Sequence, residues 1–337
     1  MRAVVYSRYG SWDVLQLKEV ETPTPGPHEV LVRIHATTVT TAGLANVSGK
    51  PFIARIFSPN LGLARPKIAI LGVELAGEIT AVGEAVTRFK VGDQIIAEPE
   101  TGAFAEYICI PEDGLLTPKP ANATYEEAAA ACDAFLTAMP FLRDGGHIQS
   151  GYRVLINGAS ASIGTMAVQI AKHLGAEVTG VCSTTNVELV MSLGADHVID
   201  YTKEDFTRNG KPYDIIFDVV AKSSFGRCKR ALTKNGVYLC SFPSLGALLP
   251  QLGSRKAKFI ATGLRPPADR LKDLQLLREF MEAGAIRTVI DRRYPLEETA
   301  EAHRYVAEGH KRGNVVITVV DEAAFGTYRS RTGGLNG

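Results

Sequence analysis

The stretch Arg153–Gly175, RVLINGASASIGTMAVQIAKHLG, decides the fold. Its first part, Val154–Asn157, is mostly apolar and is followed by Gly158, as expected of a buried parallel strand. From Ile163 to Leu174 apolar residues recur every three or four positions, which predicts a helix that Gly175 can end. A strand, a tight turn and a helix in direct succession suit a diphosphate, because the first N–H groups of a helix lack partners within it.

The turn keeps only part of the G-x-G-x-x-G pattern of dinucleotide-binding sites. Gly158 keeps the first position, Ser160 stands where the second glycine would be, and Gly164 comes one residue after the third position. A turn of this kind also occurs in parallel α/β proteins that bind no nucleotide. Our hypothesis is that a diphosphate contacts the turn and the start of the helix, through Gly158, Ala159, Ser160, Ile163 and Gly164.

Strands and helices continue to alternate after this turn. The expected strands are 177–181, 197–200, 214–219, 236–241 and 258–262, with a helix at 186–194. Strands separated by helices at this spacing imply right-handed crossovers. The pattern therefore predicts a doubly wound parallel sheet, the Rossmann arrangement.

The first 120 residues follow a different pattern, with short alternating runs separated by turns rich in proline and glycine. Such spacing predicts a small antiparallel β-domain, and segments 286–294 and 315–320 return to it. We predict one domain from 1–122 and 263–337, and a nucleotide-binding domain from 123–262. Residues 321–337 are expected to form a mobile tail, and 55–67 either a flexible loop over a cleft or a surface insertion.

Composition excludes several classes of protein. The chain has 337 residues, 45% of them hydrophobic, and a net charge of +1 without a basic run, which argues against nucleic-acid binding. Its five cysteines are scattered, which favours free thiols in a reducing cytoplasm over a disulfide framework. The N-terminus lacks the apolar core of a signal peptide, and no run of about 18 apolar residues predicts a membrane span.

Six blocks in order carry a family resemblance. They are LGVELAGEITAVGEAVTRFKVGDQI (71–95), GAFAEYICIP (102–111), FLTA (135–138), NGASASIG (157–164), GVCSTTNVELVMSLGADHVIDYTKEDF (180–206) and GHKRGNVVI (309–317). Up to about Val320 the chain resembles the medium-chain dehydrogenase/reductase superfamily, in its zinc-independent quinone oxidoreductase (ζ-crystallin-like) branch. The resemblance implies an α/β protein with a GroES-like β-rich catalytic domain beside a Rossmann domain. It also implies a cleft between the domains, hydride transfer from NADPH, and a homodimer.

The segment after the second parallel strand bears on the choice of nucleotide. An NAD site usually carries Asp or Glu about 20 residues beyond the glycine turn, whereas this strand ends in CSTTN, 182–186. An acid would repel a 2′-phosphate, and Ser183 and Thr184 can donate hydrogen bonds to it. The family often has Lys or Arg near Thr185 or Asn186, and this chain has neither. We predict NADP as the cofactor.

The resemblance also places residues at the two ends of the cofactor. Tyr201 matches a family residue that packs against the adenosine. The nicotinamide end is implied to lie near Thr137, Val219, Phe242, Gly313 and Asn314. Each of these side chains could instead serve packing or a turn.

No zinc is expected. The zinc-dependent branch places ligands near Thr40, at Val73 and near Cys132, and a catalytic zinc site needs about three protein ligands. Thr40 and Val73 cannot serve. Cys132 is interpreted as a small buried hydrophobic residue on an alanine-rich helix.

Thr40 and Thr41 are the candidate catalytic residues. The quinone reductase branch commonly has Asn-x-x-Asp where this chain has TTAG, 40–43, so the carboxylate is missing. The two hydroxyls could donate to a substrate oxygen or only satisfy the turn backbone, and neither is a general acid near neutral pH. We therefore expect the proton to come from solvent.

Together these features predict a cytoplasmic, NADPH-dependent, zinc-independent reductase of quinones or α,β-unsaturated carbonyls, with no membrane or nucleic-acid partner. One alternative is an enoyl-thioester reductase of the same architecture. The other is a non-catalytic NADPH-binding sensor or adaptor, which the missing carboxylate after Thr41 keeps open.

Overall fold

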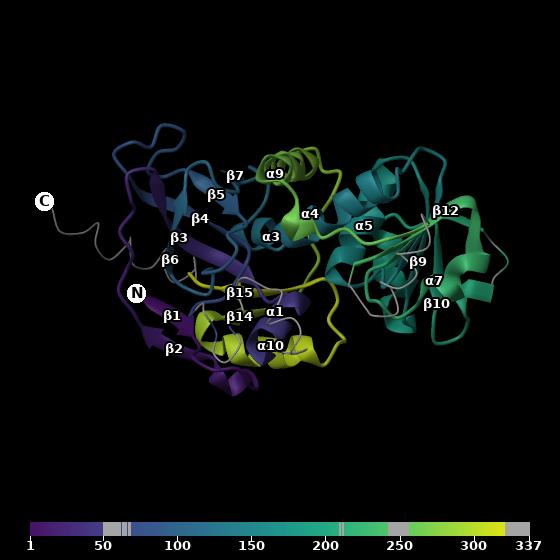
Figure 1. Cartoon of the computed structure of the whole chain (residues 1–337), viewed down its shortest axis with the longest axis horizontal. Helices are drawn as coiled ribbons and strands as arrows, with labels where there is room; N and C mark the ends of the chain where they lie inside the picture. Colours follow the sequence, from purple (N-terminus) through teal and green to yellow (C-terminus); the bar gives the residue numbers. More distant parts are fainter. Residues whose placement is uncertain are drawn as a thin grey trace, which may run out of the picture.

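The computed structural model describes residues 1–49, 62, 66, 69–208, 210, 212–241 and 256–320. Two sheets lie side by side along the long axis of the molecule (Figure 1). One is a seven-stranded, largely antiparallel sheet and the other a six-stranded parallel sheet, and a two-stranded ribbon flanks the first. Phe242, the tail 321–337 and most of the segment 55–67 lie outside the described residues.

The parallel sheet confirms the predicted doubly wound arrangement. Its strand order is β10-β9-β8-β11-β12-β13, so β8, the first strand of this sheet along the chain, lies inside it between β9 and β11. Val154 and Ile156 of β8 enter one core cluster and Leu155 the cluster on the opposite face, so both faces are buried. The strands are β8 Arg153–Asn157, β9 Glu177–Cys182, β10 His197–Asp200, β11 Tyr213–Asp218, β12 Leu232–Cys240 and β13 Ala257–Lys258.

Helices connect these strands and separate the two sheets. Gly175 follows the first crossover helix with φ +81°, which a residue with a side chain rarely adopts. The helices of this half are α3 Tyr125–Ala129, α4 Cys132–Pro140, α5 Ser162–His173, α6 Val187–Ser192, α7 Phe225–Cys228 and α9 Pro267–Glu282, with a π-helical turn η2 at Phe141–Gly145. Within the described ranges, no helix is long and apolar enough to cross a membrane.

The antiparallel sheet draws on both ends of the chain. β15 pairs antiparallel with β3, so the segment after the parallel sheet returns to the first sheet as predicted. Its elements are β3 Glu29–Thr38, β4 Leu75–Val82, β5 Gln94–Ala97, β6 Tyr107–Pro111, β7 Leu116–Pro118, β14 Ile290–Pro295 and β15 Asn314–Thr318, with helices α1 Thr41–Ser48 and α10 Thr299–Ala307. The ribbon consists of β1 Arg2–Val5 and β2 Gln16–Glu19.

Short 3-10 turns complete the connections. They are η1 Trp12–Val14, η3 Thr184–Asn186, η4 Phe206–Arg208, η5 Lys229–Ala231, η6 Thr262–Leu264 and η7 Leu296–Glu298. The expected strand at 258–262 is shorter and earlier, because β12 pairs with it only through Ala257 and Lys258 and the η6 turn follows. β14 begins at Ile290 rather than 286, because the Gln169 side chain holds the backbone N–H and carbonyl of Arg287, each at 2.9 Å.

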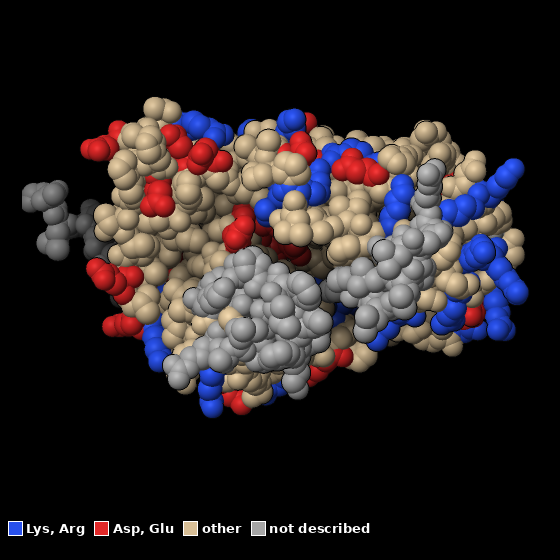
Figure 2. All heavy atoms as spheres, in the orientation of Figure 1, with Lys and Arg blue, Asp and Glu red and all other residues tan. Residues whose placement is uncertain are grey.

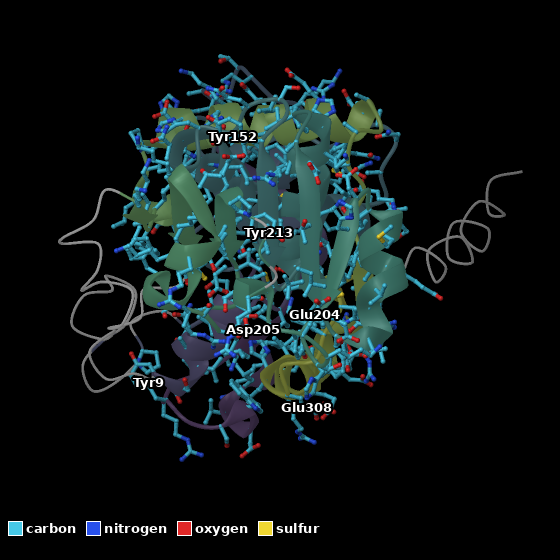
Figure 3. The ribbon with its side chains drawn as sticks, turned by 90° about the vertical axis from the view of Figure 1, so that its right-hand side faces the viewer. Tyr9, Tyr152, Glu204, Asp205, Tyr213 and Glu308 are labelled. Carbon is cyan, nitrogen blue, oxygen red and sulfur yellow. The ribbon has the colours of Figure 1, made fainter. Side chains whose placement is uncertain are left out.

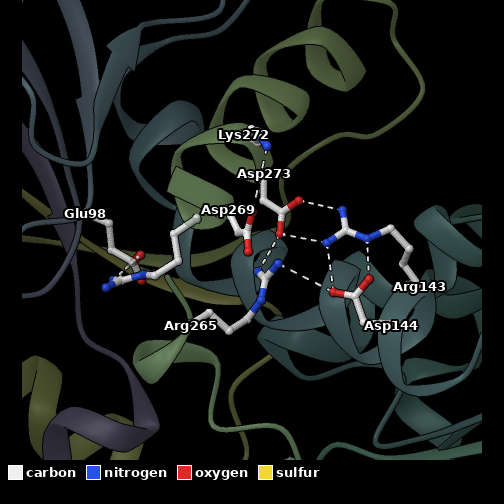
Figure 4. Close-up of polar contacts among 8 residues, drawn as sticks. Glu98, Arg143, Asp144, Arg265, Asp269, Lys272 and Asp273 are labelled. Atoms are coloured by element: carbon white, nitrogen blue, oxygen red, sulfur yellow. Dashed lines mark hydrogen bonds and ion pairs between the residues drawn. The ribbon is translucent and has the colours of Figure 1, made fainter. Parts of the chain in front are cut away.

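Helix α9 ties the two sheets together. Leu274 and Leu277 pack into the core cluster shared with α4 and β8, while the helix also contacts β7. Asp273, 2% exposed, accepts hydrogen bonds from Arg143 and Arg265, each at 2.6 Å (Figure 4). On the other side of the helix, Arg270 donates to Glu98 at 2.9 Å. The position of α9 is therefore fixed from both sides by charged pairs.

Candidate active site

A cavity of about 1000 Å³ opens at the carboxyl edge of the parallel sheet, next to β8 and β11. The connections that follow these two adjacent strands run in opposite directions. Doubly wound proteins bind nucleotides at such a point. Five basic and two acidic side chains line the cavity: Lys203, Lys222, Arg227, Lys311 and Arg312, with Glu204 and Asp205. Figure 3 shows Glu204 and Asp205 on the side of the sheet where Glu308 also lies. This excess of positive charge favours an anionic ligand.

The glycine turn leaves its backbone open toward this cavity. Gly158 has φ +86°, and a Cβ on Gly164 would lie 2.1 Å from the Gly158 carbonyl oxygen. Only glycine therefore lets helix α5 start so close to the end of β8. Ala161 precedes α5 and supplies no side-chain cap, so the N–H groups of the first turn face the cavity without a competing side chain. Gly158, Ser160 and Ala161 line the cavity.

The residues after β9 form a hydrogen-bonded cluster at the far end of the cavity. Asn186, 9% exposed, donates from Nδ2 to the Ser160 and Ser183 hydroxyls at 3.2 Å, while its buried Oδ1 has no partner in the described part of the chain. Thr184 points away and donates to Asp200 at 2.5 Å. Hydrogen bonds from Thr184 and then Thr202 hold the pKa of Asp200 below its ordinary value.

The predicted cofactor residues fall into two groups. Gly158, Ser160, Ser183 and Tyr201 line the cavity, and Tyr201 is 61% exposed. Ala159, Ile163 and Gly164 lie behind the turn, and Thr184 faces Asp200. At the other end Thr137 and Val219 are buried on α4 and directly after β11.

The segment between α10 and β15 is attached directly to the glycine turn. Gly313 donates its N–H to the Ser160 carbonyl at 2.8 Å, and Ser162 donates its hydroxyl to Asn314 Oδ1 at 2.5 Å. Gly313 has φ +68°, and a Cβ there would lie 2.3 Å from the Val289 carbonyl oxygen. These contacts place the adjacent Lys311 and Arg312 at the wall of the cavity.

The candidate catalytic threonines lie at the start of α1. Thr40 caps this helix, because its Oγ1 accepts the Gly43 N–H at 3.1 Å. An accepting hydroxyl keeps its own proton free to be donated elsewhere. Thr41 is exposed and is the first residue of the helix.

Thr38, two residues before Thr40, is hydrogen-bonded to one member of a group of buried carboxylates. Thr38 donates its hydroxyl to Glu74, 1% exposed, which also accepts the backbone N–H of Asp133 at 2.7 Å. Burial and then the charge of Asp133 raise the pKa of Glu74 well above its ordinary value. Burial likewise raises the pKa of Asp133, and it raises the pKa of Glu98 to about 7 against the opposing charge of Arg270.

Lys311 completes this group from the cavity side. Burial lowers the pKa of its ammonium group to about 8, although the charges of Asp133 and Glu74 act in the opposite direction. Figure 2 shows acidic atoms recessed in a hollow near the middle of the molecule. We refer to Glu74, Glu98, Asp133 and Lys311 as the buried ionic cluster.

Sequence reasoning missed this cluster. Its ionisable side chains approach one another from four separate segments. They follow β5, precede β4, begin α4 and follow α10. A signal was available only in part, since Glu74 and Lys311 stand within recognised blocks and Glu98 and Asp133 belong to none.

Comparison with known proteins agrees with this geometry. Two family descriptions match: an alcohol dehydrogenase GroES-like domain over residues 26–121 and a zinc-binding dehydrogenase over residues 193–317. The chain is 31% identical to an NADPH-dependent alkenal/one oxidoreductase, chloroplastic, from Arabidopsis thaliana, covering 94% of this chain and 79% of the other. It is 30% identical to a quinone oxidoreductase from Pseudomonas aeruginosa, covering 94% and 99%.

Among solved structures, the quinone oxidoreductase from Coxiella burnetii superposes with a TM-score of 0.83 at 26% identity, over 95% of this chain and 99% of that one. A GroES-like sheet beside a Rossmann-like sheet, with a basic cavity at the strand edge, defines a pyridine nucleotide-dependent oxidoreductase. The chain belongs to the medium-chain dehydrogenase/reductase superfamily, in its zinc-independent quinone oxidoreductase branch.

The positions of the zinc ligands are occupied by other side chains. Across the described residues, no three His, Cys, Asp or Glu side chains are grouped so that they could hold a metal ion. Cys132 is fully buried and donates its thiol to the Ala128 carbonyl at 3.4 Å, and burial raises its pKa well above the ordinary value. It packs as a small apolar residue rather than as a thiolate ligand.

Proposed function

We propose that this enzyme reduces quinones or α,β-unsaturated carbonyl compounds with NADPH. The observation that carries the proposal is the basic cavity at the glycine turn, whose inner end reaches the buried ionic cluster through Lys311. A bound NADPH would supply a hydride from its nicotinamide ring. The protein would hold the diphosphate at the start of α5 and leave room for a flat, electron-poor substrate at the inner end.

The names of two relatives support this choice of substrates. One is called an alkenal/one oxidoreductase and the other a quinone oxidoreductase, and both match over almost the whole of this chain. Quinones and enones share an electron-poor carbon that accepts hydride and an oxygen on which negative charge develops. Thr40 and Thr41 are our candidates to donate hydrogen bonds to that oxygen.

The charge of the cavity supports NADP over NAD. Lys203 and Arg227 line the same cavity as Ser183 and could supply the cation that is missing at Asn186. Lys203 forms an ion pair with Asp200 at 3.2 Å, and Arg227 forms one with Asp205 at 3.1 Å. Each cation would therefore have to give up an existing ion pair in order to bind the phosphate. We therefore expect a moderate preference, measurable by calorimetric titration of both cofactors.

A turnover panel tests the function. Purified protein is mixed with NADPH and either 1,4-naphthoquinone, but-3-en-2-one or crotonyl-coenzyme A, and cofactor oxidation is followed by absorbance. The proposal requires turnover of the quinone or the enone. Turnover of the thioester alone would identify an enoyl-thioester reductase, and NADPH binding without any turnover would identify a sensor or adaptor.

We also propose a homodimer located in the cytoplasm. In the described part of the parallel sheet, β13 has β12 on one side and no strand on the other, and an open edge can pair with a second copy. All five cysteines are free, which suits a reducing compartment. Light scattering should give twice the mass of one chain, and cell fractionation should place the protein with cytoplasmic markers. A monomer or an organellar location would contradict the respective part.

A further inference from the structure

Lys311 is where the basic lining of the cavity meets the buried carboxylates. Its side chain lines the cavity, is half-buried, and donates one hydrogen bond from Nζ to the Gly313 carbonyl at 2.8 Å. Among the described residues, no carboxylate lies within ion-pair distance of Nζ. An ammonium group has three protons to donate, so Lys311 keeps donors that can reach into the cavity.

Lys311 lines the cavity, and the charge of Asp133 acts on it from α4, although Asp133 itself does not line the cavity. Asp133 lies one helical turn before Thr137 on α4, so the two side chains share a face of that helix. Lys311 lies two residues before Gly313, which is bonded to the glycine turn. Thr137 and Gly313 are the residues that the proposed cofactor site places beside the nicotinamide. The reacting carbon atoms would therefore lie between α4 and the 309–313 segment.

We propose that Lys311 donates the proton that completes the reduction of an α,β-unsaturated carbonyl, and that the charges of Asp133 and Glu74 favour its ammonium form. The inference rests on the proposed function and replaces solvent as the immediate proton source. Hydride adds to the β-carbon of the substrate, and the π electrons move to the carbonyl oxygen to give an enolate. One N–H bond of Lys311 then breaks as the C–H bond at the α-carbon forms, and the neutral amine regains a proton from water in the cavity.

The surroundings of Lys311 give it a suitable acidity. Burial lowers its pKa to about 8, while Asp133, Glu74 and Asp291 act in the opposite direction. Two further charged groups nearby, Glu98 and Arg270, form an ion pair with each other. Arg312 is next to Lys311 in the chain. At neutral pH the ammonium form still dominates, and its proton is much easier to release than that of an exposed lysine.

The alternative role for Lys311 is that of a point charge that attracts a phosphate. Substitution by arginine separates the two roles, because a guanidinium keeps the positive charge and cannot release a proton in this range. Lys311→Met removes both the charge and the proton while keeping an unbranched chain. Lys222→Met is the matched control, since Lys222 lines the same cavity and is absent from the buried ionic cluster.

The kinetic test uses but-3-en-2-one and NADPH. Both Lys311→Arg and Lys311→Met should lower kcat by about a hundredfold, the usual contribution of a general acid. Lys311→Arg should bind NADPH nearly as tightly as the native protein, as measured by calorimetry. A Lys311→Arg enzyme with native kcat would overturn the proposal, because charge alone would then suffice.

The pH dependence gives a second kinetic readout. Since the protonated form is the donor, kcat should fall as the pH rises through the pKa of Lys311. Asp133→Asn removes a charge that raises this pKa, so the alkaline limb should move to lower pH. Lys222→Met should leave the limb in place. A limb that does not move in Asp133→Asn would contradict an effect of the Asp133 charge on Lys311.

A third readout needs neither substrate nor cofactor. In protein labelled with ¹³C-lysine, the Cε signal that disappears in Lys311→Arg belongs to Lys311 and should titrate near pH 8. Titration near the ordinary lysine value of 10.5 would overturn the proposal even if the native enzyme is active. A native protein that turns over neither quinone nor enone would instead remove the proposed function and this step with it.

Discussion

The glycine turn and the buried ionic cluster both contribute to the lining of one cavity, the cluster through Lys311, and they are built in different ways. The turn is a local structure, since Gly158 and Gly164 come within six residues and their backbones touch. The cluster is assembled from four segments, with Glu74 and Lys311 more than 200 residues apart. A local site is determined by its own sequence, whereas an assembled site depends on every element that brings its members together.

The largest effect is expected from breaking the local site. In Gly164→Ala the new Cβ would meet the Gly158 carbonyl oxygen at 2.1 Å, so β8 and α5 must separate, at a cost of about 1–3 kcal/mol or more. Calorimetry should find NADPH binding abolished, and the melting temperature should fall. Gly226→Ala is the control, because its Cβ would meet nothing within 4 Å. Native NADPH affinity in Gly164→Ala would remove the turn from the site.

The next effect concerns the scaffold of the assembled site. Asp273→Asn leaves Arg143 and Arg265 without their shared buried carboxylate (Figure 4), which should cost about 3 kcal/mol in the free energy of unfolding. On the same helix Asp269 pairs with Lys272 at 3.9 Å at the surface, so Asp269→Asn should change stability by less than about 1 kcal/mol. Urea unfolding measures both. Equal losses in the two variants would show that α9 is not held by Asp273.

A smaller effect should appear in cofactor choice. Ser183→Asp places a carboxylate at the end of β9, where it would repel a 2′-phosphate and accept hydrogen bonds from a free ribose. We expect the order of affinities to reverse in favour of NADH, with a change of about tenfold, or 1.4 kcal/mol. Ser183→Asn is the uncharged control and should keep the native order. Equal binding of NADPH and NADH by the native protein would contradict the assignment of NADP.

An effect of similar size is expected at Thr40. Thr40→Val removes a hydroxyl that caps α1 and is our candidate donor to the substrate oxygen, so kcat should fall about tenfold, or 1.4 kcal/mol in the barrier. The lost cap should also cost about 1 kcal/mol of stability. Thr40→Ser keeps both functions and should behave like the native enzyme. If Thr40→Val loses stability but keeps its kcat, the hydroxyl serves the helix alone.

The same contrast explains what could be predicted from the sequence. The doubly wound parallel sheet and Gly175 at the end of α5 follow from periodicity and glycine positions, which act over a few residues. The β13 segment was misplaced because its extent depends on pairing with β12 rather than on its own residues. The domain division at 122 and 262 stays a prediction, because α9 packs with α4 and also contacts β7.

The candidate site shows the same difference between residues that a local motif identifies and residues that only the assembled fold brings together. Residues next to a motif, such as Ser160 and Ser183, were named and line the cavity. Glu98, Asp133 and Lys311 were not named, although Lys311 lies within a recognised block, because a carboxylate or an ammonium group in a sequence shows neither its burial nor its neighbours. Their altered pKa values arise from burial, which only the assembled fold creates.

The central claim is that hydride passes from NADPH to a carbon atom of the substrate in this cavity, and it can be tested directly. NADPH deuterated on the transferred position of the nicotinamide is incubated with the enzyme and but-3-en-2-one, and the saturated ketone is analysed by NMR. We predict deuterium at the β-carbon and a hydrogen derived from water at the α-carbon. A saturated ketone without deuterium at the β-carbon, or no reduced product with the enone or with 1,4-naphthoquinone, would contradict the claim.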